Sequence, residues 1–121
     1  MDLNNPVVKL CAEGAQAEFQ GRLPDARTLY WQAWEMAKDD YEACIAAHYV
    51  ARFQESPEEA LRWNQEALDR ANAVDPELVK DFFPSLYVNM GRSFELLGNQ
   101  AEARRYYDLA AGLGCIHAAG S

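Results

Sequence analysis

The chain has 121 residues, of which half are apolar and a quarter charged, and this composition is typical of one globular domain with a continuous core. Nineteen acidic against eleven basic residues give a net charge of −8, which makes nucleic-acid phosphates and anionic lipid poor general partners. We expect a cytoplasmic protein, because there is no secretion signal, no apolar stretch of about 18 residues, and no close pair among Cys11, Cys44 and Cys115.

Proline, glycine and capping residues mark the ends of the predicted helices. Asn5 before Pro6 is an N-cap followed by a proline at the first helical position, and Gly21 can supply the left-handed residue that ends this helix. Ser56 and Glu59 form a capping box for a later helix. No window alternates with a period of two for long enough to be a strand, so the predicted fold class is all-α. We expect helices over about residues 6–20, 24–38, 41–54, 57–73 and 99–112.

The segment from Asp75 to Phe83 is irregular. Asp75 and Pro76 open a helix, but Pro84 lacks an amide hydrogen and disfavours helical geometry at Phe83. The segment therefore forms either one long helix kinked at Pro84 or a short helix over 76–82 followed by a new one. We favour the kinked continuous helix, because no glycine or polar cluster marks a turn.

An internal repeat organises the chain. Pairs of alanines seven residues apart recur with a spacing of 34 and then 43 positions, and the nine residues 75–83 account for the longer interval. A spacing near 34 is the period of a helix–turn–helix repeat, whose copies must stack to bury their apolar faces. We predict one domain over residues 1–121 with repeats at about 7–40, 41–74 and 84–117. The alanine pairs are Ala26 and Ala33, Ala60 and Ala67, and Ala103 and Ala110.

The repeat resembles the tetratricopeptide repeat (TPR), which has a small residue in its first helix, a glycine turn, and an alanine, an aromatic and an alanine in its second helix. The first unit carries Leu10, Gly14, Gly21, Ala26, Tyr30 and Ala33, and the third carries Tyr87, Gly91, Gly98, Ala103, Tyr107 and Ala110. The resemblance implies an α-α superhelix (solenoid) of three repeats, with the first helix of the third repeat extended. The second unit is a weaker match, because His48 replaces a small residue and Asn64 replaces an aromatic. One hypothesis is that these two residues compensate for each other's size.

The C-terminal end lacks the extra helix that usually covers the last TPR unit. The ten residues after Ala111 are too short and glycine-rich for such a helix, so the outward residues Tyr106, Leu109 and Leu113 should be bare. We therefore expect a homodimer through this face, or its coverage by another subunit. The alternative is that residues 115–121 fold over it.

The resemblance also implies a concave groove, lined by the first helix of each unit, in which peptides lie. Arg52 and Arg92 could clamp a carboxylate or phosphate there, unless each pairs with a local acid such as Glu55 or Glu95. Tyr49 and Phe53 lie one helical turn apart and could stack on a ligand, unless they only pack between helices. The predicted peptide-binding residues are Tyr49, Arg52, Phe53, Asn89 and Arg92.

The predicted function is a non-catalytic scaffold or adaptor that binds a peptide or a partner helix. The sequence offers no base, nucleophile or ligand set in a pocket, so we predict no catalytic residue, no metal and no cofactor; His48 is interpreted as a partly buried structural residue. One alternative is a regulatory peptide-sensing subunit. Another is a subunit of an RNA-modifying enzyme, because the chain is similar to small bacterial TPR proteins of unassigned role, some with names suggesting RNA methylation. The chain has neither a methyl-donor glycine loop nor an Asn-Pro-Pro motif.

Overall fold

The computed structural model describes residues 4–113. The secondary structure of this part of the chain consists of helices joined by loops and turns, with no strand. None of its helices is long and apolar enough to cross a membrane. The all-α prediction is confirmed for these residues. The elements are α1 (Pro6–Phe19), α2 (Leu23–Met36), α3 (Asp40–Val50), the short 3-10 helix η1 (Ala51–Phe53), α4 (Pro57–Asn72), α5 (Pro76–Val79), α6 (Phe83–Leu96) and α7 (Gln100–Gly112).

The helix ends form as the capping residues predict. The Asn5 side chain accepts hydrogen bonds from the backbone N–H of Val7 and Val8, and the Ser56 side chain accepts one from the N–H of Glu59. Gly21 follows α1 with φ +80°, a conformation that only glycine adopts at no steric cost. Local chemistry therefore accounts for where α1 and α4 begin and where α1 ends.

The prediction of one extended, kinked helix through Pro84 is wrong. Helix α5 ends at Val79, and α6 begins as a separate helix at Phe83, with Pro84 in its first turn. Pro84 has no N–H to bond the carbonyl of Lys80, and its ring would collide with that carbonyl in a continuous helix. The chain instead turns over residues 80–82, where the N–H of Phe82 bonds the carbonyl of Val79 at 2.8 Å.

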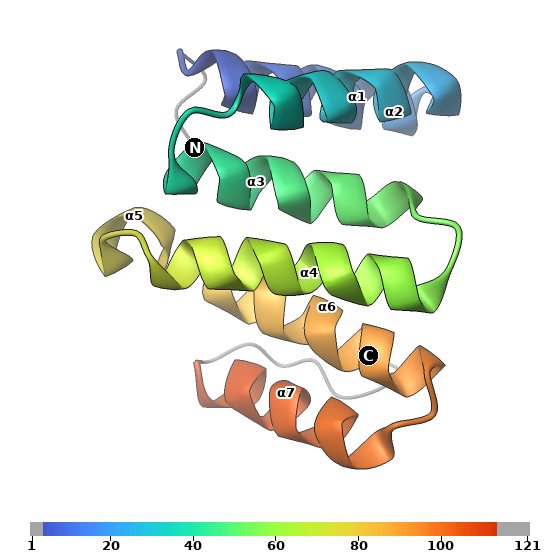
Figure 1. The fold of residues 1–121 in the computed structure, drawn as a ribbon, viewed down its shortest axis with the longest axis vertical. Helices are drawn as coiled ribbons and strands as arrows, with labels where there is room; N and C mark the ends of the chain where they lie inside the picture. The colour runs from blue at the N-terminus through green and yellow to red at the C-terminus, as the bar shows by residue number, and fades with distance from the viewer. Residues whose placement is uncertain (1–3, 114–121) are drawn as a thin grey trace.

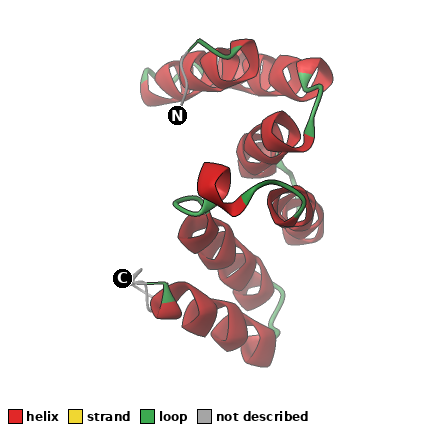
Figure 2. Cartoon of the chain, turned by 90° about the vertical axis from the view of Figure 1, so that its left-hand side faces the viewer, coloured by secondary structure: helices red, strands yellow, loops and turns green. Residues whose placement is uncertain are grey.

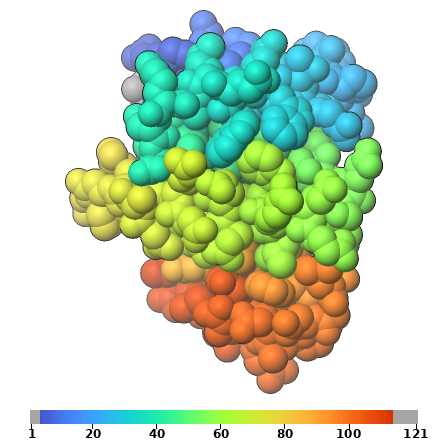
Figure 3. Space-filling model, in the orientation of Figure 1, coloured from blue at the N-terminus to red at the C-terminus, as the bar shows by residue number. Residues whose placement is uncertain are grey.

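Consecutive helices pack as three pairs, namely α1 with α2, α3 with α4, and α6 with α7. Helices α2 and α3 join the first pair to the middle pair, and α4 and α6 join the middle pair to the last. The pairs follow one another along the long axis of the molecule, from α1 and α2 at one end to α7 at the other (Figures 1 and 2). The segment around α5, drawn in yellow, projects from one side of the molecule about half-way along its length (Figure 3).

The core runs through all three pairs. Its buried residues form three clusters, and the cluster around Leu86 and Met90 also takes in Val79, which fixes α5 against α4. Cys11 and Cys44 are buried free thiols, and burial raises the pKa of each to about 12. These two cysteines therefore act as small apolar core residues, as predicted. Cys115 lies outside the described residues.

The outward face of α7 is only partly as predicted. Leu109 and Leu113 are 40% and 54% exposed, but Tyr106 is buried. Tyr106 stacks on Phe94 at a ring distance of 5.7 Å, so its side chain points into the last pair rather than away from it. The alternative, in which residues 115–121 fold over this face, concerns residues outside the described part of the chain.

Candidate functional site: a polar pocket between the middle and last helix pairs

The first and last pairs share one packing arrangement. A Cβ atom on Gly14 would lie 2.4 Å from the ring of Tyr30, and one on Gly91 would lie 2.9 Å from the ring of Tyr107. Each tyrosine therefore packs directly on the backbone of the neighbouring helix. The Tyr30 hydroxyl donates to Glu18 at 2.9 Å, and the Tyr107 hydroxyl donates to Glu95 at 3.0 Å.

The middle pair departs from this arrangement at all three positions. The repeat spacing of 34 and 43 places His48 at the position of the two glycines, Asn64 at that of the two tyrosines, and Arg52 at that of the two glutamates. The middle pair thus has a larger residue on its first helix, a smaller one on its second, and a cation in place of a carboxylate.

The two junctions between pairs differ in the same way. At the first junction, Tyr30 stacks on Tyr49 at 5.0 Å and contacts Phe53 at 5.6 Å, and Val50 completes an apolar cluster. By repeat spacing, Asn64, Arg92, Ser93 and Leu96 stand at the second junction where these four residues stand at the first. Two tyrosines, a phenylalanine and a valine are thus replaced by residues that are polar or smaller.

A pocket of about 430 Å³ lies at this second junction, within the volume range of small-ligand sites. Its walls come from the end of α1, the end of α3, η1 and the loop after it, the first half of α4, and the second half of α6. Its charged and polar side chains are Glu18, His48, Arg52, Gln54, Glu55, Ser56, Asn64, Asn89, Arg92 and Ser93, and the remaining lining residues are Ala51, Pro57, Ala60 and Leu96.

Three of the five predicted binding residues line this pocket, namely Arg52, Asn89 and Arg92. Tyr49 and Phe53 do not, because their rings pack against Tyr30 at the first junction. The structure therefore gives these two aromatics the packing role that was their alternative interpretation.

The predicted clamp of two free arginines is not formed. Arg52 is engaged by Glu18 through two hydrogen bonds, one of them from Nε to Oε1 at 3.1 Å. The Arg52 guanidinium lowers the pKa of Glu18, which keeps this carboxyl ionised. The alternative of a paired arginine is therefore correct for Arg52, although its partner is Glu18 rather than Glu55 or Glu95.

Arg92 is the cation that remains available. Its side chain is exposed, and no hydrogen bond or ion pair joins it to another of residues 4–113. Glu95, its nearest candidate partner in sequence, accepts from Tyr107 instead. One guanidinium thus faces the pocket in a chain whose overall charge is strongly negative.

Asn64 and Ser93 line the pocket as a buried hydrogen-bonded pair. They are 6% and 4% exposed, and Asn64 Nδ2 donates to Ser93 Oγ at 3.1 Å. The hydroxyl hydrogen of Ser93 has no acceptor among the described residues, so it can donate to a ligand. Ala60 is only half-buried beside them, unlike Ala26 and Ala103, because its helix faces the pocket here.

His48 lies at the edge of the pocket and packs edge-on against Tyr49 and Phe82. Its Nδ1 lies 3.3 Å from Asn89 Nδ2, so the prediction of a partly buried histidine with a polar partner is confirmed. Burial, with a smaller contribution from Arg52, lowers the pKa of His48 to about 4. The imidazole is therefore neutral at pH 7.

This neutral histidine predicts a pH dependence of stability. Between pH 6.5 and 4 the unfolded chain binds a proton on His48 that the folded chain does not, so stability falls as the pH falls, by up to about 3 kcal/mol. Urea unfolding across this range measures the slope, and His48→Asn should flatten it. Equal slopes in the two proteins would contradict the neutral imidazole. Glu18, whose pKa is lowered, loses its contribution only at lower pH.

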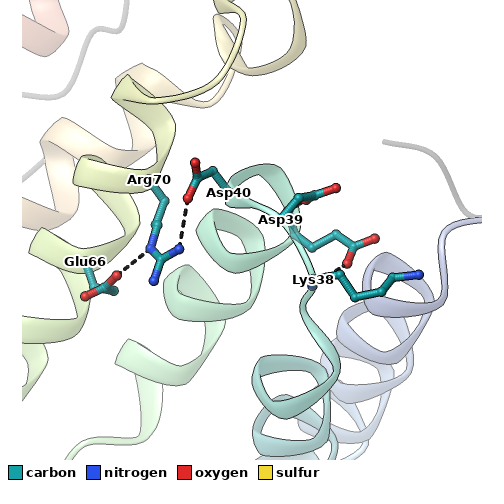
Figure 4. Close-up of polar contacts among 6 residues, drawn as sticks. Lys38, Asp39, Asp40, Glu66 and Arg70 are labelled. Atoms are coloured by element: carbon teal, nitrogen blue, oxygen red, sulfur yellow. Dashed lines mark hydrogen bonds and ion pairs between the residues drawn. The ribbon is translucent and has the colours of Figure 1, made fainter.

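A second hollow, of about 540 Å³, lies at the junction of α2, α3 and α4. Its arginine, Arg70, is already held by Asp40 at 2.9 Å and by Glu66 at 2.7 Å, and Figure 4 shows these contacts. Asp39 caps α3 through the N–H of Glu42. Because Arg70, Asp40 and Asp39 already serve as structural partners, we take the first pocket as the candidate site.

Sequence reasoning did not place Ser93 or Asn64 in the lining of a pocket. A signal for both was present, because the repeat spacing aligns Ser93 with Val50 and Asn64 with Tyr30, and a polar residue at a packing position indicates a gap. The pairing of Arg52 with Glu18 had no comparable signal.

Comparisons with protein-family models, curated proteins and solved structures returned no match to this chain. Among the described residues, no group of three or more His, Cys, Asp or Glu side chains is placed to hold a metal ion. The site is therefore interpreted from its own geometry.

Proposed function

We propose that the chain is a non-catalytic binding module of the tetratricopeptide type, which binds a peptide or a partner helix at the pocket between its middle and last helix pairs. The repeated Gly–Tyr contacts of the first and last pairs, and the positive φ of Gly21 and Gly98, support the TPR-like solenoid. The observation that carries the binding proposal is the pocket itself. It opens where packing residues of the first junction are replaced at the second by Asn64, Arg92 and Ser93.

The arrangement favours binding over catalysis. The neutral His48 contacts Asn89, Glu18 is held by Arg52, and the Asn64 amide contacts Ser93. These pairs provide fixed hydrogen-bonding groups rather than a nucleophile beside a base. Self-association through Leu109 and Leu113 remains a prediction and does not enter this proposal.

A displayed peptide library, selected on the purified chain, tests the proposal. We expect enriched peptides to bind the native chain and to lose at least about tenfold in affinity to Ala60→Trp, because the indole fills the pocket beside Asn64. Ala101→Trp, at an exposed position of α7 outside the pocket, is the matched control and should bind as the native chain does. Circular dichroism confirms that both variants fold.

Two results would overturn the proposal. One is the absence of any enriched peptide. The other is a set of peptides that bind Ala60→Trp as tightly as the native chain, which would place binding elsewhere on the molecule.

A further inference from the structure

Two residues of the pocket lining keep hydrogen-bond donors that the described contacts leave unused. Arg92 contributes a guanidinium with no hydrogen bond or ion pair to another of residues 4–113, and Ser93 contributes a hydroxyl hydrogen. The Glu18 carboxylate, in contrast, already accepts hydrogen bonds from Arg52 and Tyr30. A ligand that satisfies these donors must bring an acceptor of its own.

Among the charged side chains of the lining, the ion pair between Arg52 and Glu18 singles out Arg92 as the arginine with no ion pair to another described residue. Glu18 neutralises Arg52, which leaves Arg92 facing the open space beside Asn64 and Asn89. Glu55 is the remaining acid of the lining and is exposed in the loop before α4. A planar guanidinium binds a carboxylate through two parallel hydrogen bonds, which makes it a stronger partner for a carboxylate than for a neutral amide.

An apolar contact lies beside the cation. Leu96 is 68% exposed, lines the pocket, and lies one helical turn after Arg92 on α6. A large leucine exposed in this way gains from burial under a ligand side chain. The pocket therefore offers an anion partner and an apolar contact about one turn apart.

Resting on the proposed function, we infer that the pocket recognises a carboxylate of a peptide, bound by Arg92 with Ser93 as a second donor, next to an apolar side chain that covers Leu96. Arg52 acts as a positioning residue, because its guanidinium is held by Glu18 and in turn fixes η1 at the pocket wall.

Three short peptides test this inference by ¹H–¹⁵N NMR titration of the full chain. The probes are N-acetyl-Leu-Glu-amide, N-acetyl-Leu-Gln-amide, and N-acetyl-Leu-Gln with a free C-terminal carboxylate. The readouts are the Nε–H signal of Arg92 and the side-chain amide signals of Asn64 and Asn89. We expect saturable shifts with a carboxylate-bearing probe and affinity at least about tenfold weaker for the uncharged probe. The two charged probes distinguish a side-chain carboxylate from a C-terminal one.

Two variants that each remove one positive charge separate the role of Arg92 from a general effect of charge. Arg92→Ala should abolish the preference for the charged probes, whereas Arg104→Ala, at an exposed position of α7 outside the pocket, should keep it. Both should leave the melting temperature almost unchanged. A preference that survives Arg92→Ala would overturn the assignment of this residue.

The failures of the two proposals can be told apart. Equal binding of charged and uncharged probes at the pocket would overturn the carboxylate inference and leave peptide binding standing. If no probe shifts a pocket signal while library peptides still lose affinity to Ala60→Trp, the carboxylate inference also fails alone. If the library yields nothing and the probes shift nothing, both proposals fail.

Discussion

Replacing Tyr30 with alanine should lower the free energy of unfolding by about 3–5 kcal/mol, the range expected when a large aromatic is removed from a core. Tyr30 is 1% exposed and joins the first and middle helix pairs through Tyr49 and Phe53. The surrounding backbone is helical on every side, so it cannot collapse fully into the space that the ring leaves. Urea denaturation followed by circular dichroism measures the loss.

Two matched variants separate the contributions of the ring and the hydroxyl. Tyr107→Ala removes the equivalent ring of the last pair, and it should cost less because Tyr107 is only half-buried. Tyr30→Phe removes only the hydrogen bond to the ionised Glu18 carboxylate and should cost about 1.5–3 kcal/mol. If Tyr30→Ala were no more damaging than Tyr107→Ala, the first junction would not be the more tightly packed one.

The two junctions differ in how closely their outer residues pack. The first junction is filled by rings and is expected to hold the first two helix pairs as one body. The second junction keeps apolar contacts deeper in the core, around Leu86 and Met90, and replaces the outer ones by polar groups. The pocket thus lies where the packing residues of the first junction are replaced by polar or smaller residues.

The helices themselves could be predicted because their signals are local. Asn5, Ser56 and Gly21 act on the backbone within three residues, so their effect does not depend on the rest of the fold. The break before Pro84 could not be decided in the same way. A proline can either kink a helix or break it, so its local chemistry does not choose between these outcomes; the separate α5 is stabilised by the burial of Val79, a long-range contact.

The candidate site was only partly predictable, because its contacts join distant segments. Arg52 and Glu18 are 34 residues apart, and no local pattern marks them as partners. The repeat spacing places Glu18, Arg52 and Glu95 at one position of successive pairs, but it does not show that two of them are in contact. The single arginine among glutamates shows where the middle pair differs. The sequence placed Tyr49 on the correct helix. It did not show that the ring of Tyr49 stacks on Tyr30, which belongs to another helix pair.

His48 and Asn64 should be energetically coupled, because together they replace the Gly–Tyr contact of the other two pairs. Asn64→Tyr alone should destabilise the chain by about 1–3 kcal/mol, since a ring at this position leaves no space for even a Cβ on the facing residue. His48→Gly alone should cost at least about 1 kcal/mol, from the low helix propensity of glycine and the lost contacts with Tyr49 and Phe82.

The double variant should cost less than the sum of the two single variants, by about 0.5–3 kcal/mol, because a tyrosine at position 64 can then pack on a glycine as Tyr30 does on Gly14. A double-mutant cycle in urea measures this coupling energy. The same double variant fills part of the pocket and should weaken the charged peptide probes. If the two costs simply add, the middle pair does not share the packing of its neighbours, and the pocket has another structural origin than the exchange of these two residues.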